Sequence, residues 1–255
     1  MNPILVALDL ADAAAALALA DRLRGAVGGF KIGSQLFSSA GPEIVRTLAS
    51  RGDRVFLDLK FHDIPNTVAG AVAAATGLGV WMLNVHASGG SAMLEAAREA
   101  ADAAAGRTGR PRPLVIAVTV LTSLDAAALQ ATGIQRSPLD QVLHLARMTQ
   151  AAGLDGVVAS PQETAAIRQA CGRDFVIVTP GIRGGAAASG PDDQRRTMTP
   201  AGAIEAGSSY LVVGRPITAA DDPRAAAERI LTDLRSGSSR SQGPQERMPA
   251  QPAEV

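Results

Sequence analysis

Two lysines are the first candidates for chemistry in this chain, because every other basic residue is an arginine. Lys31 and Lys60 are the only lysines among the 24 basic side chains. A guanidinium is permanently charged and cannot hand over a proton, whereas a lysine ammonium is a compact charge that can. Each lysine lies at the end of a short apolar run, in the segments 30–33 and 55–60. The pattern indicates two positions where arginine cannot replace lysine, and hence proton chemistry at the ends of strands.

Lys60 belongs to a cluster of acidic and basic groups that favours a role as proton donor. The segment 58–63 reads DLKFHD. Alternate residues of a strand point to the same side, so Asp58 and Lys60 are expected to project together. Burying such charges is costly unless they pair, and Lys31, Asp58, Lys60 and Asp63 alternate in sign. Nearby carboxylates favour the charged form of Lys60, which suits a proton donor and not a Schiff-base lysine. For any single Asp–Lys pair, an ordinary structural ion pair remains the alternative.

The elements that must position these groups alternate regularly along the chain. Continuous apolar runs are typical of parallel strands buried on both faces, and they predict strands at 3–9, 28–33, 54–60, 80–86, 113–120, 155–159, 175–179 and 209–213. Helical patterns fall between them at 12–25, 42–51, 66–77, 90–105, 138–152, 162–171, 200–206 and 223–235. Eight strands with eight helices predict an α/β fold, a single-domain (β/α)8 TIM barrel over 1–235. An open doubly wound sheet is disfavoured because no Gly-x-Gly-x-x-Gly follows the first strand.

Two segments do not fit the repeating unit. Residues 181–199 are too long and too rich in Gly and Ala for an ordinary turn, which is typical of an active-site lid. Residues 236–255 are polar, rich in Ser, Pro and Gln, and without periodicity. We expect this terminal segment to be a disordered tail.

Polar side chains gather at the predicted mouth of the barrel. Active sites of such barrels lie at the carboxyl ends of the strands. Asp9, Lys31, Asp58 and Lys60 lie at the ends of the first three strands, and His86 ends the fourth. His86 is equally well explained as a ligand contact or as a structural histidine. The sequence therefore predicts a charged site built by the first half of the barrel.

The second half of the barrel carries a signal for an anion. Arg183 follows strand 7, and Gly214 and Arg215 follow strand 8. Loops at these two positions often bind phosphate through backbone N–H groups and the start of a short helix. Gly214 allows close backbone approach, and Arg215 can form a forked contact with phosphate oxygens. A turn glycine and a surface arginine are the alternative reading of this pair.

Several other polar side chains have a structural explanation, and for some a contact with a ligand is the alternative. Thr122 and Ser123 follow strand 5, where a hydroxyl can meet a ligand or cap a helix. Asn66 and Thr67 are cap candidates for the helix that follows strand 3. We interpret His62 as a surface or packing residue.

Composition limits the classes of function. The formal net charge is zero, which gives no reason to expect nucleic acid or an anionic membrane as a partner. Cys171 is the single cysteine, so an intrachain disulfide and a cysteine-based metal site are excluded. The three histidines lack metal-ligand spacing, and we predict no metal. No apolar run approaches the length of a membrane span, so we expect a soluble cytoplasmic protein.

The ten residues 58–67, DLKFHDIPNT, resemble the signature of the orotidine 5′-phosphate decarboxylase family, in its bacterial form. Seven further blocks agree in order and position: VALD at 6–9, FKIG at 30–33, NVHASGG at 84–90, VTVLTS at 118–123, TPGIR at 179–183, DDQRR at 192–196 and VVGRPI at 212–217. The resemblance covers about 1–235. It implies decarboxylation of orotidine 5′-monophosphate (OMP) to UMP, the last step of de novo pyrimidine synthesis, by a carboxy-lyase without metal or organic cofactor. It also implies a homodimer of (β/α)8 barrels.

The resemblance also implies a role for each matching position. Lys60 would protonate C6 of the pyrimidine, Asp58 would lie near the substrate carboxylate, and Lys31 and Asp9 would bind the ribose. Asp63 and Thr67 would reach the neighbouring subunit's site. The remaining substrate contacts would be Thr122 after strand 5 and the phosphate-binding residues Arg183, Gln194, Gly214 and Arg215. Small residues fill the chain between Arg183 and Gln194, where this sequence departs most from the commonest pattern.

Loss of CO₂ from C6 leaves a vinyl carbanion, which a preorganised ammonium can stabilise and then protonate. Phosphate binding far from the reacting carbon can supply energy for closing a lid.

Three other functions stay open. Sugar-phosphate decarboxylases and synthases share the Asp-x-Lys-x-x-Asp motif but use a divalent metal. A Schiff-base aldolase would use Lys60 covalently, and a phosphate-ligand binding protein would bind UMP without turnover.

Overall fold

The computed structural model describes residues 1–182 and 198–240, which include a closed barrel of eight parallel strands in sequence order. The strands are β1 (Ile4–Ala7), β2 (Gly29–Gly33), β3 (Val55–Phe61), β4 (Met82–His86), β5 (Leu114–Val118), β6 (Gly156–Val158), β7 (Val176–Thr179) and β8 (Tyr210–Val213). The barrel closes where β1 pairs with β8. The predicted (β/α)8 barrel is confirmed, since each apolar run forms a strand.

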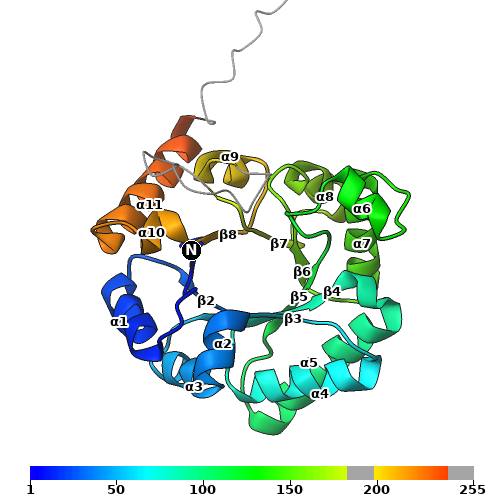
Figure 1. Cartoon of the computed structure of the whole chain (residues 1–255), viewed down its shortest axis with the longest axis horizontal. Helices are drawn as coiled ribbons and strands as arrows, with labels where there is room; N and C mark the ends of the chain where they lie inside the picture. Colours follow the sequence, from blue (N-terminus) through cyan, green and yellow to red (C-terminus); the bar gives the residue numbers. More distant parts are fainter. Residues whose placement is uncertain (183–197, 241–255) are drawn as a thin grey trace, which may run out of the picture.

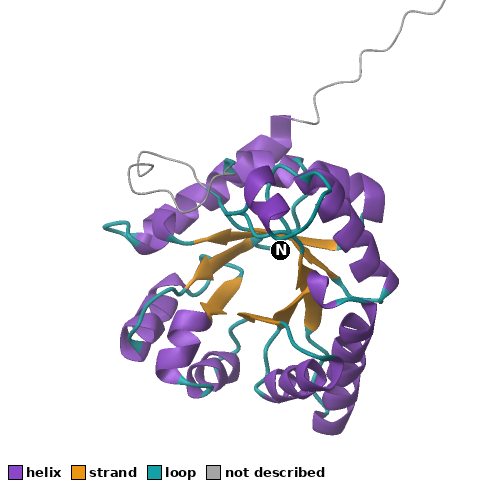
Figure 2. Ribbon diagram, turned by 45° about the vertical axis from the view of Figure 1, so that its right-hand side comes forward, coloured by secondary structure: helices purple, strands orange, loops and turns teal. Residues whose placement is uncertain are grey.

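Helices surround the strands on the outside of the ring (Figures 1 and 2). The eight predicted helices correspond to α1 (Ala13–Leu23), α3 (Glu43–Ser50), α4 (Pro65–Gly77), α5 (Ser91–Thr108), α7 (Pro138–Ala151), α8 (Thr164–Cys171), α9 (Pro200–Glu205) and α11 (Pro223–Arg240). Because α11 continues to Arg240, residues 236–240 are helical and do not belong to a tail without regular structure. The rest of the predicted tail, 241–255, lies outside the described residues.

Four short helices lie in the loops that follow strands, at the mouth of the barrel. They are α2 (Ser34–Ala40), η1 (Ala87–Gly89), α6 (Ala126–Ala131) and α10 (Arg215–Thr218). The sequence predicted no bounds for them, because helices this short show no clear apolar period. They set the conformation of the loops that frame the site.

The barrel interior is apolar at its base and polar at its mouth. Leu5, Phe56, Met82, Ile116 and Val178 form a separate buried cluster inside the ring. The inward positions then turn polar within two residues along several strands. Phe56 is followed by Asp58 on β3, and Met82 by Asn84 on β4. The larger core cluster lies on the other side of the strands, between the barrel wall and the helices.

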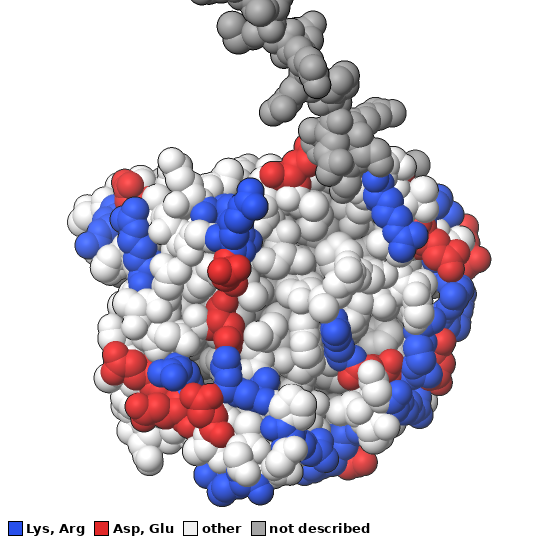
Figure 3. All heavy atoms as spheres, turned by 180° about the vertical axis from the view of Figure 1, so that it is seen from behind, with Lys and Arg blue, Asp and Glu red and all other residues white. Residues whose placement is uncertain are grey.

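The described surface carries charges of both signs. On the face seen in Figure 3, Lys and Arg side chains lie next to Asp and Glu side chains around the rim. This arrangement fits the formal net charge of zero. Among the described helices, none is both long enough and apolar enough to span a membrane.

Candidate active site

Four charged side chains from the first three strands meet at the mouth of the barrel. Lys31 Nζ lies 3.0 Å from Asp9 Oδ1 and 3.4 Å from Asp58 Oδ2. Lys60 Nζ lies 2.7 Å from Asp58 Oδ1. The order Asp9–Lys31–Asp58–Lys60 therefore alternates in sign, and each ammonium has a carboxylate partner.

The four side chains differ in solvent exposure, and this difference separates structural from reactive groups. The side chains of Lys31 and Asp58 are only 10% and 13% exposed, whereas that of Lys60 is 37% exposed. Asp58 is thus the central acceptor that fixes both ammonium groups. Lys60 is held at one end by Asp58 and still faces the open mouth, where a ligand can reach it.

Lys60 has an unusual backbone conformation for its position in a strand. Its φ angle is +53°, and among the described residues it is the only non-glycine with positive φ. The pairing of β3 with β4 shifts here, from Leu57 opposite Leu83 to Phe61 opposite Val85. The predicted contact between Asp58 and Lys60 is present, and the two side chains lie on the same side of β3, although the backbone at Lys60 departs from regular strand geometry. A left-handed residue of this kind costs on the order of 1–3 kcal/mol, and such strain clusters at functional sites.

Asn84 forms hydrogen bonds to the irregular part of β3, where the register with β4 shifts and the strand bulges. The sequence did not single out this residue. It lies on β4 with no exposed surface. The backbone N–H of Lys60 donates to Asn84 Oδ1 at 2.9 Å, and Asn84 Nδ2 donates to Asp58 Oδ1 at 2.7 Å. A polar side chain inside the apolar run 80–86 was the available signal, since a buried amide requires partners.

Gly33 at the end of β2 makes room for the charged group and was also missed. A Cβ at this position would lie 2.9 Å from Lys31 Nζ and 3.2 Å from Asp9 Oδ1. Its φ of −92° is accessible to any residue, so backbone conformation does not require glycine here. Glycine is required because any larger residue would occupy the space that the Lys31–Asp9 ion pair needs.

Asp63 lies apart from the charges with which the sequence grouped it. The ion pairs of Lys31 and Lys60 run to Asp9 and Asp58, whereas Asp63 is exposed and accepts a hydrogen bond from the Ile64 N–H at 2.6 Å. Within one chain, Asp63 therefore does not join the Asp9–Lys31–Asp58–Lys60 series, because it lies in the exposed segment that follows β3.

Thr67 is exposed in the first turn of α4. The N-cap of this helix is Ile64, which makes no side-chain capping bond, and Pro65 is the first helical residue. The prediction that Asn66 or Thr67 caps the helix is therefore wrong.

The rings of two histidines in this region pack against each other. The ring centroids of His62 and His86 are 5.3 Å apart, with the planes tilted by 31°. Burial lowers the pKa of His86, nearby His62 and Lys60 lower it further, and Asp58 opposes them. His86 is therefore a neutral group beside the charged residues at neutral pH. His62 is exposed and packs on His86, as the sequence predicted.

The residues expected to hold phosphate are only partly described. Gly214 directly follows β8 and is the N-cap of α10, and Arg215 is the first residue of that short helix, with an exposed side chain. A Cβ at Gly214 would make only an ordinary contact, 3.8 Å from the Ala7 Cβ. Arg183 and Gln194 lie outside the described residues, as does most of the expected lid 181–199.

Thr122 is half-buried in the turn after β5. Asp125 caps helix α6, so neither Thr122 nor Ser123 is its N-cap.

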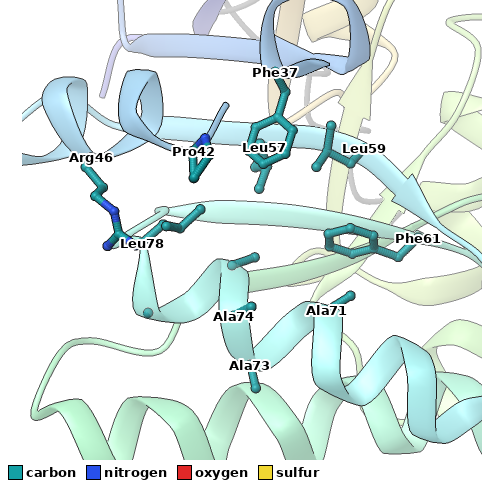
Figure 4. A pocket seen from close by; sticks show the side chains of 12 residues that line it. Phe37, Pro42, Arg46, Leu57, Leu59, Phe61, Ala71, Ala73, Ala74 and Leu78 are labelled. Atoms are coloured by element: carbon teal, nitrogen blue, oxygen red, sulfur yellow. The ribbon is translucent and has the colours of Figure 1, made fainter. Parts of the chain in front are cut away.

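A separate hollow lies behind the charged group, on the helix side of β3. It has a volume of about 510 Å³ and is mostly apolar, with Arg46 at one side (Figure 4). Leu57, Leu59 and Phe61 of β3 form one wall, and alanines of α4 such as Ala71 form another. Asp58 and Lys60 alternate with these leucines and the phenylalanine along the strand. This pocket contains no group that performs proton chemistry, so the candidate site remains the barrel mouth.

A (β/α)8 barrel with paired ammonium and carboxylate groups at its mouth has the architecture of a barrel enzyme. A sequence model described as the orotidine 5′-phosphate decarboxylase / HUMPS family matches residues 2–230, and the chain belongs to this family. It is 58% identical over 234 residues to an orotidine 5′-phosphate decarboxylase of Moorella thermoacetica, covering 91% of this chain and 92% of the relative. The identity is also 58% over 233 residues to the protein of the same name from Chromobacterium violaceum, with the same coverage.

Solved structures agree with these sequence relationships. The crystal structure of orotidine 5′-phosphate decarboxylase from Lactobacillus acidophilus superposes with a TM-score of 0.81 at 39% identity, covering 92% of this chain and 99% of that one. An uncharacterized conserved protein from Geobacillus kaustophilus superposes with a TM-score of 0.80, also at 39% identity, covering 91% of this chain and 100% of that one. The barrel is therefore shared across its whole length with these proteins.

Proposed function

We propose that this protein is a carboxy-lyase that converts OMP to UMP and CO₂ in pyrimidine biosynthesis, without a metal or organic cofactor. The observation that carries the proposal is the ammonium of Lys60, held 2.7 Å from Asp58 at the open mouth of a barrel. The names of the relatives supply the substrate. The arrangement of charges supplies a mechanism that needs no additional group.

In this mechanism the bond between C6 and the carboxylate carbon breaks, and its electron pair stays on C6 as CO₂ departs. Lys60 stabilises the developing negative charge, because a fixed ammonium in a partly dehydrated site needs no reorganisation at that moment. The ammonium then transfers a proton to C6, which yields UMP and a neutral amine. Solvent returns a proton to the amine before the next turnover. Asp58 holds the Lys60 side chain in place before the proton is transferred and after it is restored.

The remaining expected residues bind the rest of the nucleotide. Lys31 and Asp9 would contact the ribose from β2 and the end of β1, with Thr122 as a further contact. Gly214 and Arg215 would bind the phosphate with Arg183 and Gln194. The packing at Gly214 supports this role, since the described part of the chain leaves space for a side chain there. A ligand that approaches the backbone explains the glycine better than internal packing does.

We further propose a homodimer in which Asp63 and Thr67 enter the neighbouring subunit's site. Residues 62–67 are all exposed, and Ile64 is 66% exposed despite its size. Among the described residues, Asp63 forms no ion pair with the lysines of its own barrel. A second copy would cover this segment and give Asp63 a site to complete. We place the enzyme in the cytoplasm, where its nucleotide substrate would be made.

A metal-dependent sugar-phosphate decarboxylase or synthase is the main competing function, since such enzymes share the Asp-x-Lys-x-x-Asp motif that Asp58, Lys60 and Asp63 form. In that case carboxylates at the mouth would hold a divalent cation. Here Asp9 and Asp58 are both ion-paired with lysines, so a cation would sit among ammonium groups. The ion pair of Lys60 likewise disfavours an aldolase that needs a neutral amine. Among the described residues, no three His, Cys, Asp or Glu side chains are grouped as metal ligands.

The deciding experiment incubates the purified protein with OMP and EDTA and follows the loss of ultraviolet absorbance. Conversion to UMP under chelation supports both the substrate and the cofactor-free mechanism. Failure with OMP, together with activity on a sugar phosphate after addition of Mg²⁺, would establish the competing function. UMP binding without turnover would identify a binding protein. Borohydride trapping that labels Lys60 would identify an aldolase.

A further inference from the structure

Asn84 occupies a place where an apolar side chain would normally stand. Its neighbours on β4, Leu83 and Val85, are fully buried and face the helices, and Met82 belongs to the apolar cluster inside the barrel. A fully buried amide without partners is costly. Within residues 1–182 and 198–240, the side chain of Asn84 meets that requirement only through β3, by its bonds to the Lys60 N–H and the Asp58 carboxylate.

The register of the two strands explains why these bonds exist. Three residues of β3, from Asp58 to Lys60, lie between the paired positions Leu57 and Phe61, while Asn84 alone lies between their partners on β4. The extra length leaves the Lys60 N–H without a regular partner in the β4 backbone. The side-chain oxygen of Asn84 accepts that N–H in its place, at 2.9 Å. The irregular register of β3 therefore leaves a free backbone N–H, and the Asn84 amide satisfies it.

We propose that Asn84 is a positioning residue for the reaction: it fixes the left-handed backbone of Lys60 and the orientation of Asp58 together. The proposal rests on the function assigned to Lys60 above. One amide group makes both contacts, and its orientation is determined because Oδ1 must accept from Lys60 while Nδ2 must donate to Asp58. Asn84 thus acts through two other residues, and it needs no contact with the substrate.

Two substitutions separate the two contacts. Asn84→Leu removes both hydrogen bonds at similar volume. Asn84→Asp keeps an acceptor for the Lys60 N–H but replaces the donor to Asp58 by an oxygen. With OMP as substrate we expect kcat to fall by about 10²-fold in each variant, the loss typical of a displacement of about 1 Å at a reacting group. We expect KM and the affinity for UMP to change little, because the phosphate and ribose contacts lie elsewhere.

The pH dependence provides a readout that a purely structural role would not alter. In Asn84→Asp the new carboxylate lies against Asp58, so the pair favours binding a shared proton. The protonated acid can donate to Asp58 as the amide does, so kcat of this variant should recover as the pH falls. Asn84→Leu should show no such recovery. The titratable groups around this position are Asp58 and Lys60 on β3, Lys31 on β2, Asp9 after β1, and His86 on β4 with His62 against it.

Thr149→Val is a matched control. Thr149 is also fully buried, and its hydroxyl donates to the Leu145 carbonyl at 2.8 Å within α7, far from the mouth. This variant should lose stability and keep kcat. Near-wild-type kcat in both folded Asn84 variants would overturn the proposal, as would an equal loss of kcat in the control. If Asn84→Leu does not fold, Asn84→Asp and its pH profile decide.

A structure of an Asn84 variant tests the proposal without any substrate. We expect Lys60 to leave the left-handed region, or its ammonium to leave Asp58. A variant that retains both features would refute the positioning role even if the wild-type protein did not act on OMP. Conversely, a wild-type protein inactive on OMP would refute the proposed function while leaving this geometric result intact.

Discussion

Gly33→Ala is a small change with an effect that can be worked out from the structure. The new methyl group would lie 2.9 Å from Lys31 Nζ, whereas ordinary contacts begin near 3.4 Å. The ammonium would therefore have to retreat by about 0.5 Å, since the backbone of β2 is fixed on both sides by β1 and β3. Its contacts with Asp9 at 3.0 Å and Asp58 at 3.4 Å are the ones affected.

The expected effects on stability and on rate differ. The backbone of Gly33 suits alanine, and replacing such a glycine stabilises by about 0.4–1 kcal/mol through the unfolded chain. Strain at the Lys31–Asp9 pair opposes this gain, so we expect a net change within about 1 kcal/mol. A displacement of 1 Å at a reactive group can cost about 10²-fold, so half of that distance should cost on the order of 10-fold in kcat/KM.

The assay combines steady-state decarboxylation of OMP with urea unfolding. Gly106→Ala in α5 is the matched control, because Gly106 is exposed and a Cβ there would meet nothing within 4 Å. That variant should gain stability, by up to about 1 kcal/mol, and keep its activity. Wild-type kcat/KM in Gly33→Ala would show that the position of the Lys31 ammonium is not critical and that our reading of this glycine is incorrect.

Four further predictions follow from the site and the pocket. Lys60→Ala should fold and lose about 10²–10⁴-fold or more in kcat, as for loss of a general acid, and near-wild-type activity would contradict the assignment. Arg215→Ala should raise KM for OMP by about 10–100-fold through loss of a charged hydrogen bond, and an unchanged KM would refute the phosphate role. The lowered pKa of His86 means that the unfolded chain binds a proton more readily, so stability should fall as the pH drops below about 6.5. In urea titrations at about pH 7.5 and about pH 5.5, His86→Gln should show a smaller difference than wild type. Ala71→Leu should fill the pocket beside β3 and raise stability by about 1 kcal/mol, whereas Ala103→Leu on the exposed face of α5 should not.

The strands were predictable because each is a continuous apolar run, and a parallel barrel buries both faces of its strands. The charges at the mouth were predictable because an acid or amine at the end of such a run must meet a neighbour of opposite sign. Asp63 shows the limit of that reasoning. It is only three residues from Lys60 in the sequence, but it is exposed after the end of β3 while Lys60 pairs with Asp58, and no pattern of residue types encodes that difference.

Asn84 and Gly33 show a second limit. A lone amide in an apolar strand signals a buried hydrogen bond, but not with which strand or atom. A glycine at a strand end signals close approach, but not of which group. The left-handed conformation of Lys60 depends on a register shift between two strands, which is a property of the pair and is encoded in neither alone. These details emerge only when the barrel closes.

The apolar cluster at the base of the barrel has a kinetic consequence. This cluster fills the interior of the barrel beneath the charged group, so the barrel is open at its mouth and blocked at its base. Its buried members are Leu5, Phe56, Met82, Ile116 and Val178. Because this cluster fills the base, a nucleotide that reaches Lys60 must enter at the mouth, and the product must leave there as well. Substrate cannot bind behind a departing product. UMP should therefore compete directly with OMP, and the release of product sets an upper limit on turnover however fast the chemical step becomes.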